Sequence, residues 1–181
     1  MKILDVGCGN NKYIGGKEDK VIGIDKINLP SVDVVHEIEK IPWPFKKNEF
    51  DMVICSHVLE HVENIIKVMK EIHRITKPGG IVIIKVPYFT SPGAFTDPTH
   101  RRFFTLDTFD YFDKNTILGK TLSYEVENIN FKIEEKKLFF PRSFNILLIP
   151  LLVKISPRIY EEFFSRIFSA REIYFRLRVI K

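Results

Sequence analysis

Two glycines and an acidic residue near the start of the chain have the types and spacing needed to hold a nucleotide. Gly7 and Gly9 directly follow the first apolar run, where glycines allow a tight turn and a close approach of the backbone to a ligand. A second apolar run, Val21–Asp25, ends in a carboxylate near the ~20-residue offset at which nucleotide-binding α/β folds place an acid on the ribose hydroxyls. A structural turn explains the glycines alone, whereas a nucleotide site also explains the acid. A dinucleotide motif fits less well, because Lys12 stands at its last glycine position.

A second group of residues with chemical potential follows the run Phe50–Cys55. His57, Glu60 and His61 have the spacing H-x-x-E-H, which matches a zinc-binding motif. That motif needs an isolated metal-binding helix, whereas here it comes directly after an apolar strand. We therefore expect no metal, a catalytic role for His57, and a packed, hydrogen-bonded role for His61.

A third candidate site is the polar triplet His100-Arg101-Arg102 within the aromatic loop 95–104. The loop follows an apolar strand at its carboxyl end, the edge at which open α/β sheets bind ligands. One interpretation is a surface loop with a packed aromatic cluster. We favour a substrate loop, because such a triplet is poor core material. His100 would then act as a base, oriented by Asp97, and Arg101 or Arg102 would pair with an anionic group.

Alternating strand and helix patterns predict the elements that carry these residues. Five apolar runs predict strands at Lys2–Val6, Val21–Asp25, Val32–His36, Phe50–Cys55 and Ile81–Val86. Apolar residues at helical spacing predict a helix from Val62 to Ile75, stopped by Lys77–Gly80, and Thr105 is a candidate N-cap for a later short helix. This order predicts an α/β fold with a doubly wound, mostly parallel sheet.

The first 90 residues resemble the class I S-adenosylmethionine-dependent methyltransferases. The similar segments are the ILDVGCG turn, Asp25 at the end of the second strand, the block Glu37–Val62 with its Ile-Pro-Trp-Pro-Phe turn and Phe-Asp pair, and the KPGG turn at Lys77–Gly80. The resemblance implies a seven-stranded Rossmann-like methyltransferase fold and S-adenosylmethionine as cofactor.

The resemblance also implies roles for individual residues. Asp25 would hold the ribose, Glu37 the adenine amino group, and Ile38 would pack on the adenine ring. Ser56 and His57 would line the floor beneath the methionine moiety and the substrate, and Asp51 would be structural. The full set of cofactor residues implied is Asp5, Gly7, Cys8, Gly9, Asn11, Asp25, Lys26, Glu37, Ile38 and Ser56, with His57, His100 and Arg102 as catalytic residues.

The chain departs from the family pattern at the glycine turn. Asn11 replaces the third glycine, and residues 7–20 are close to the ~12-residue minimum for a parallel crossover. The first helix should therefore be vestigial or missing. Because no helix precedes the first strand either, the cofactor is held more openly or something else covers it.

The C-terminal part predicts a strand within Thr121–Phe140 and a half-buried antiparallel strand at Glu172–Lys181. Between them lies a helical insertion, residues 141–170, in one domain spanning 1–181. Its run SFNILLIPLLVKI includes Phe144, Ile146–Ile149 and Leu151–Val153, and basic residues follow it. One interpretation is a cap that completes the core. The alternative is a roof over the active site that docks on a membrane or a lipid-linked acceptor.

Composition excludes several classes of protein. The 181 residues are 45% hydrophobic, enough for one core, and carry a net charge of +5. Two cysteines are too few for a disulfide scaffold or a cysteine-bound cluster. Without a signal segment or an ~18-residue apolar stretch, we expect a cytoplasmic protein that is soluble or peripheral to a membrane.

The sequence favours methyl transfer to a small-molecule, glycan or lipid-linked acceptor. An RNA methyltransferase is an alternative, supported by the pI of about 9.1. Against it, the fourth strand ends in Ile-Cys-Ser, without the proline of nucleic-acid methylation motifs. A non-catalytic cofactor-binding or interaction protein is a third alternative, suggested by Asn11 and the short crossover. The acceptor atom and the oligomeric state are not predicted.

Overall fold

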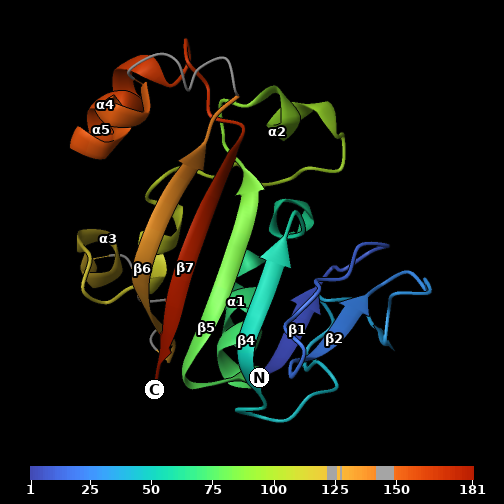
Figure 1. Cartoon of the computed structure of the whole chain (residues 1–181). Coiled ribbons are helices and arrows are strands. Elements are labelled where there is room, and N and C mark those ends of the chain that lie inside the picture. Colours follow the sequence, from blue (N-terminus) through green and yellow to red (C-terminus); the bar gives the residue numbers. More distant parts are fainter. Residues whose placement is uncertain (122–125, 127, 142–148) are drawn as a thin grey trace.

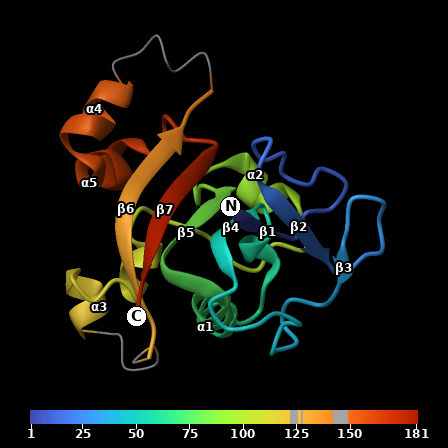
Figure 2. The same cartoon turned by 60° about the horizontal axis from the view of Figure 1, so that its bottom comes forward.

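Seven strands form a single mixed sheet in the computed structural model, which describes the whole chain except residues 122–125, 127 and 142–148 (Figures 1 and 2). The strands are β1 (Lys2–Val6), β2 (Lys20–Asp25), β3 (Val34–Val35), β4 (Phe50–Ser56), β5 (Thr76–Pro87), β6 (Asn130–Phe139) and β7 (Glu172–Ile180). Their order is β3-β2-β1-β4-β5-β7-β6. The first five are parallel, and β7 runs antiparallel to both β5 and β6. The predicted mostly parallel seven-stranded sheet is confirmed.

The main helix is α1 (Ile65–Ile75), which begins three residues later than predicted. Val62 is extended, and the Asn64 side chain caps the helix by accepting a hydrogen bond from the Lys67 N–H. The remaining helical segments are short: η1 (Leu59–His61), α2 (Pro92–Thr96), η2 (Thr108–Phe112), α3 (Ile117–Thr121), α4 (Ile149–Ile155), α5 (Pro157–Ile159) and η5 (Tyr160–Phe164).

Several predicted boundaries differ from the structure. The cap of η2 is Asp107, because the Thr105 N–H is used in a hydrogen bond to Thr108 Oγ1. Thr121 ends α3, and the strand predicted within Thr121–Phe140 is observed as β6 from Asn130; residues 122–125 and 127 of that range lie outside the described residues. Lys77–Gly80 ends the helix as predicted, but its residues already belong to β5, beside an irregularity in the pairing with β4.

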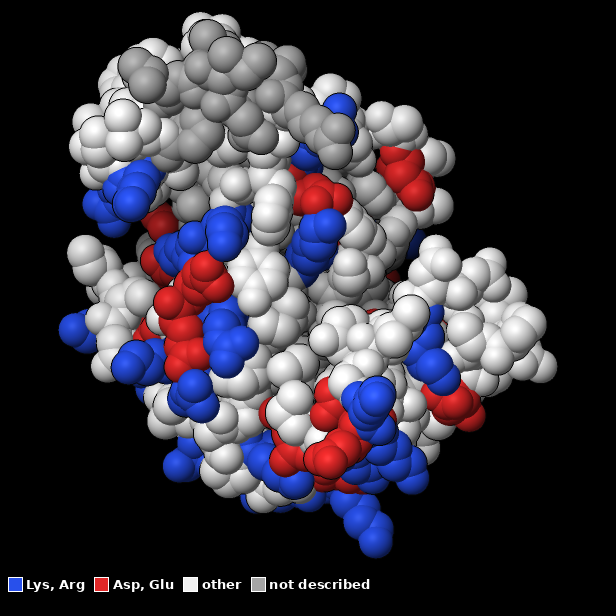
Figure 3. All heavy atoms as spheres, in the orientation of Figure 1, with Lys and Arg blue, Asp and Glu red and all other residues white. Residues whose placement is uncertain are grey.

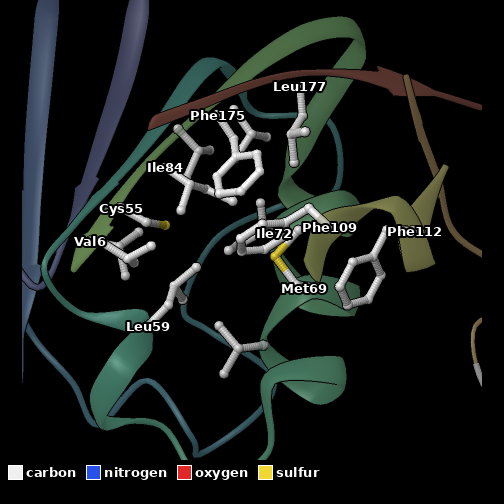
Figure 4. Close-up of a cluster of buried hydrophobic side chains, with 14 of the residues drawn as sticks. Val6, Cys55, Leu59, Met69, Ile72, Ile84, Phe109, Phe112, Phe175 and Leu177 are labelled. Carbon is white, nitrogen blue, oxygen red and sulfur yellow. The ribbon is translucent and has the colours of Figure 1, made fainter. Parts of the chain in front are cut away.

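The core lies on one face of the sheet, under α1 and η2 (Figure 4). Leu177 and Phe175 of β7, Ile84 of β5 and Cys55 of β4 point into the same cluster, all fully buried. Met69 and Ile72 of α1 and Phe109 of η2 meet them from the helical layer. The alternation predicted for the last strand is confirmed, since Ile173, Phe175, Leu177 and Val179 are all buried.

The opposite face of the sheet has a thinner covering. Residues 8–19 form no helix, as predicted, and pack as a loop on β1 and β2, where a Cβ on Gly23 would lie 2.6 Å from Cys8 Sγ. On β6 and β7 this face carries charged side chains, including Glu134, which binds Arg176 at 3.0 Å and Arg178 at 2.5 Å. Figure 3 shows this band of alternating acids and bases.

The described part of the insertion, residue 141 and residues 149–170, lies at the carboxyl end of β6 (Figure 1). Tyr160 is fully buried there against Phe140 and Tyr88, and the Tyr88 hydroxyl donates to Glu161. This segment therefore adds to the core at the β6 side of the sheet, whereas the missing first helix would cover β1 and β2. The predicted apolar residues Phe144 and 146–148 lie outside the described residues. No helix in the described ranges is long and apolar enough to cross a membrane.

Candidate cofactor and acceptor site

A pocket of about 480 Å³ lies where the order of strands reverses, with β2 on one side of β1 and β4 on the other. Open α/β sheets bind ligands at the carboxyl ends of the strands at such a point. The lining comes from the segments that follow β1, β2, β3 and β4 and from the loop after α2: Gly7, Asp25, Lys26, Ile27, Glu37, Ile38, Glu39, His57, Val58, His61, Val62, Glu63, Thr99 and Arg101. The volume suits a nucleoside-sized ligand.

The glycine turn forms one wall of the pocket. Gly7 has φ 67° and donates its N–H to Ile24 O at 2.8 Å. A Cβ on Gly7 would lie 2.5 Å from Cγ2 of Val58, so only glycine fits between β1 and the turn after β4. Gly9 has φ 50°, but no atom lies within 4 Å of where its Cβ would be. The two glycines therefore differ: Gly7 permits tight packing, while Gly9 faces open space.

Asp25 lies at the end of β2 and lines the pocket. Its carboxylate accepts hydrogen bonds from the Gly9 N–H and the Ile27 N–H, both at 3.0 Å. Each carboxylate oxygen can accept more than one hydrogen bond, so Asp25 retains acceptor capacity toward a ligand. These bonds also hold the glycine turn against β2.

The adjacent wall is supplied by Lys26, which follows β2, and by Glu37 and Ile38, which follow β3; all three belong to the set predicted to contact a cofactor. Ile38 is only 8% exposed, and its carbonyl accepts from the indole Nε1 of buried Trp43 at 2.8 Å. This bond fixes the chain beneath the pocket. The apolar side chain of Ile38 beside the carboxylate of Glu37 suits a ligand that contains an aromatic base with an amino group.

Five residues of the predicted cofactor set do not line the pocket: Asp5, Cys8, Gly9, Asn11 and Ser56. Asp5 is buried, accepts from the Tyr13 N–H at 2.7 Å, and has a pKa raised by burial. Cys8 is buried behind the turn, and burial raises its pKa to about 11. Asn11 and Ser56 are exposed. Asp5 and Cys8 shape the turn, so their direct contact with a cofactor remains a prediction.

His57 lies on the pocket wall directly after β4, with φ 53°. Its Nδ1 is 3.3 Å from Glu60 Oε1 and its Nε2 is 3.0 Å from Glu172 Oε1. The close contact with the Glu60 carboxylate, together with the charge of Glu172, raises the pKa of His57. Glu172 is itself held by Lys85 at 2.7 Å. Glu172 was missed from the sequence because it begins β7, far along the chain, and only the antiparallel pairing with β5 brings it here.

The loop with His100, Arg101 and Arg102 is tied to the turn after β4. The N–H groups of Arg101 and Arg102 both donate to Glu60 O, at 2.7 and 3.1 Å. The Arg102 guanidinium donates to the carbonyls of Val62 and Glu63, so it holds the loop in place. Arg101 lines the pocket instead. This geometry favours Arg101 over Arg102 as the partner of an anionic group.

The histidines of this region are placed differently from one another. His61 lines the pocket, and its Nδ1 bonds Thr99 Oγ1 at 2.9 Å, which fits the predicted hydrogen-bonded role. His100 packs edge-on against the His61 ring, with centroids 4.7 Å apart, behind the pocket lining. Asp97 Oδ2 is 4.0 Å from His100 Nε2, too far for a hydrogen bond that would orient the ring.

None of the described residues 149–170 lines this pocket, so the part of the insertion that is described does not form the expected roof.

Comparison with known proteins agrees with this geometry. A family profile described as methyltransferase domain matches residues 4–84. An uncharacterized protein of Methanocaldococcus jannaschii is 31% identical over 163 residues, which are 87% of this chain and 63% of that protein. A demethylmenaquinone methyltransferase of Geobacillus stearothermophilus is 35% identical over 101 residues, 45% of this chain and 43% of the relative.

The chain thus spans less than two thirds of the length of these relatives. Among solved structures, an S-adenosylmethionine-dependent methyltransferase from Archaeoglobus fulgidus superposes with a TM-score of 0.57 at 17% identity, covering 98% of this chain and 85% of that one. Residues 4–84 thus match the methyltransferase-domain family, and the chain has the fold of a solved S-adenosylmethionine-dependent methyltransferase, with a pocket at the strand reversal.

Proposed function

We propose that the protein transfers a methyl group from S-adenosylmethionine to a small apolar acceptor. The observation that carries the proposal is the pocket at the carboxyl ends of β1, β2 and β4, which joins Asp25, Glu37 and Ile38 to His57 in one cavity. When bound, S-adenosylmethionine supplies an electrophilic methyl group. The chain's task is then to exclude water and to hold the acceptor in line with that group.

His57 can accept a proton from an acceptor at Nε2 once that nitrogen leaves Glu172, whose side chain is 29% exposed, whereas its other carboxylate partner, Glu60, is buried. His57 lies on the pocket wall, and Glu60 and Glu172 hold its ring from two sides. Its raised pKa makes it a stronger base than an unperturbed histidine, although it is protonated over more of the neutral range. Arg101, on the same wall, lies 3.6 Å from the exposed Glu63 carboxylate and can exchange that partner for an anionic group of the acceptor.

The class of acceptor is suggested by the relative that acts, by its name, on demethylmenaquinone, a quinone. We propose an apolar acceptor of that kind, reached at a membrane surface. Support comes from five exposed apolar side chains at four-residue intervals in the insertion: Leu151, Ile155, Ile159, Phe163 and Ile167, which are 47–73% exposed. Lys154, Arg158 and Arg166 lie among them and are exposed as well. Apolar and basic residues together suit an anionic membrane interface.

Calorimetric titration with S-adenosylmethionine and S-adenosylhomocysteine tests the proposed function. We expect one binding site per chain with an affinity in the micromolar range, followed by methyl transfer in a screen of quinol, phenol and lipid-linked acceptors. Binding without turnover on any acceptor class would favour a non-catalytic cofactor-binding protein. Absence of binding would contradict the proposal altogether.

Vesicle co-sedimentation tests the membrane contact. Ile155→Glu/Phe163→Glu should lower binding to vesicles of phosphatidylcholine with phosphatidylglycerol at least about tenfold, because two large apolar contacts become charged. The matched control is Ile14→Glu/Ile117→Glu, which changes charge equally at two exposed isoleucines outside the insertion. Binding of the wild-type protein should also fall as salt is raised. Failure of the wild-type protein to bind at low salt, or equal loss in both double variants, would refute this contact.

A further inference from the structure

Three potential metal ligands meet beside the pocket. Glu60, His61 and His100 each offer one ligand atom, and these atoms all lie within 4.8 Å of one another. Glu60 and His61 belong to η1, while His100 follows α2. The main-chain N–H groups of Arg101 and Arg102 donate to Glu60 O and hold the two segments together. The backbone itself therefore keeps His100 close to Glu60 and His61.

Hydrogen bonds fix both histidines in the form suited to bind a cation. His100 Nδ1 lies 3.0 Å from Ala94 O, and because a carbonyl only accepts, Nδ1 is the donor. The Thr99 hydroxyl donates to Asp97 Oδ1 at 2.7 Å, so its oxygen accepts from His61 Nδ1. When the rings are neutral, the lone pair is therefore on Nε2 of both. Metal-binding histidines commonly use the second nitrogen in this way, bonded to a carbonyl, a carboxylate or a similar acceptor.

Glu60 supplies the negative charge. Its side chain is 1% exposed, and neither carboxylate oxygen accepts a hydrogen bond from the described residues. His57 Nδ1 lies 3.3 Å from Oε1. A buried carboxylate without hydrogen bonds is costly, and a bound cation would offset that cost.

We propose that Glu60, His61 and His100 bind one divalent first-row transition-metal ion. Two imidazole nitrogens and one carboxylate are the donors that zinc and iron(II) sites use when they leave positions open to water or substrate. Bonds of about 2.0–2.2 Å require the three groups to draw slightly closer on binding. The H-x-x-E-H pattern thus contains two ligands, but His57 is engaged by Glu172 and the third ligand is His100.

The position of the ion would matter for the acceptor. His61 and its partner Thr99 both line the pocket, so an ion held here lies at the pocket wall. An acceptor hydroxyl bound to such an ion loses its proton more readily. This consequence, unlike the metal binding itself, rests on the proposed methyl transfer, and it narrows the acceptor to one that carries an oxygen nucleophile.

Titration of chelator-treated protein with Co²⁺ and Zn²⁺ tests the site. We expect one ion per chain and visible Co²⁺ absorption bands in the wild-type protein. His100→Ala, His61→Ala and Glu60→Gln should each weaken binding at least about tenfold. His36→Ala is the matched control, since His36 bonds Lys40 O and takes no part in the cluster, and it should bind as the wild type does.

S-adenosylhomocysteine titration on the same samples separates the two proposals, and circular dichroism checks that each variant is folded. If Glu60→Gln fails to fold, the two histidine variants decide. Cofactor binding with no stoichiometric metal, or metal binding that His61→Ala and His100→Ala leave unchanged, would overturn the metal site. Metal binding without cofactor binding would instead overturn the proposed function.

Discussion

Replacing Asp25 by alanine should weaken binding of S-adenosylhomocysteine at least about 100-fold, as measured by calorimetry. The carboxylate lines the pocket with acceptor capacity to spare, and two charge-assisted hydrogen bonds to ribose hydroxyls are worth about 1.5–3 kcal/mol each. The substitution also releases the Gly9 and Ile27 N–H groups that Asp25 holds. Loss of ligand contacts and loosening of the turn therefore act in the same direction.

Two further variants separate these contributions. Asp25→Asn keeps an oxygen acceptor but removes the charge, and should lose less affinity than the alanine variant. Asp33→Ala removes a neighbouring acid that holds the Gly23 N–H and Lys12 but does not line the pocket, and should bind nearly as the wild type does. An Asp25→Ala protein that binds within about threefold of the wild type would contradict the ribose role assigned to Asp25.

Gly7→Ala should destabilise the fold by about 2–5 kcal/mol in urea unfolding. The residue has φ 67°, which costs a non-glycine residue about 1–2 kcal/mol. The new Cβ would also lie 2.5 Å from Val58 Cγ2, and overpacking adds about 1–3 kcal/mol.

Gly9→Ala is the matched control, because Gly9 has a similar φ but open space around its Cβ position. It should cost only about 1–2 kcal/mol. Combining Gly7→Ala with Val58→Ala removes the closest contact, with Cγ2 at 2.5 Å, and leaves the contact with Val58 Cβ at 2.8 Å, so the double variant should lose less stability than the two single changes added together. Equal effects of Gly7→Ala and Gly9→Ala would show that the contact with Val58 is unimportant.

The sequence predicted those strands and helices whose position is set by the hydrophobic pattern of their own residues. The continuous apolar runs of β1 and β4 reflect burial on both faces of the sheet. The helical spacing of α1 and the alternation in β7 reflect burial on one face, and their periods reveal it. The start of β6 and the helix α3 were missed. Thr121 has strand propensity, but its hydroxyl bonds Ile117 O in α3, and local propensity does not reveal such a context.

The candidate site was predicted where it depends on neighbouring residues and missed where distant segments meet. Gly7, Asp25, Glu37 and His57 follow directly on strands, so their place at the sheet edge could be inferred. The contact of His57 with Glu172 depends on strand pairing across the sheet. The contact of His61 with His100 depends on main-chain hydrogen bonds to Glu60 O. Because main-chain bonds do not depend on side-chain identity, the sequence did not reveal this contact.

The place of β7 in the sheet has a consequence for how the chain acquires its structure. β7 is the last strand in sequence, yet it lies between β5 and β6 and pairs with both, so β6 has no neighbour until β7 arrives. Pairs such as Ile84 with Phe175 join residues from distant parts of the chain. Such non-local pairing slows folding, because the chain must lose the entropy of closing a long loop before the stabilising contacts between the strands can form. During synthesis, β6 must therefore wait for residues 172–180, and in a nascent chain that lacks them the edge of β5 that pairs with β7 is unpaired.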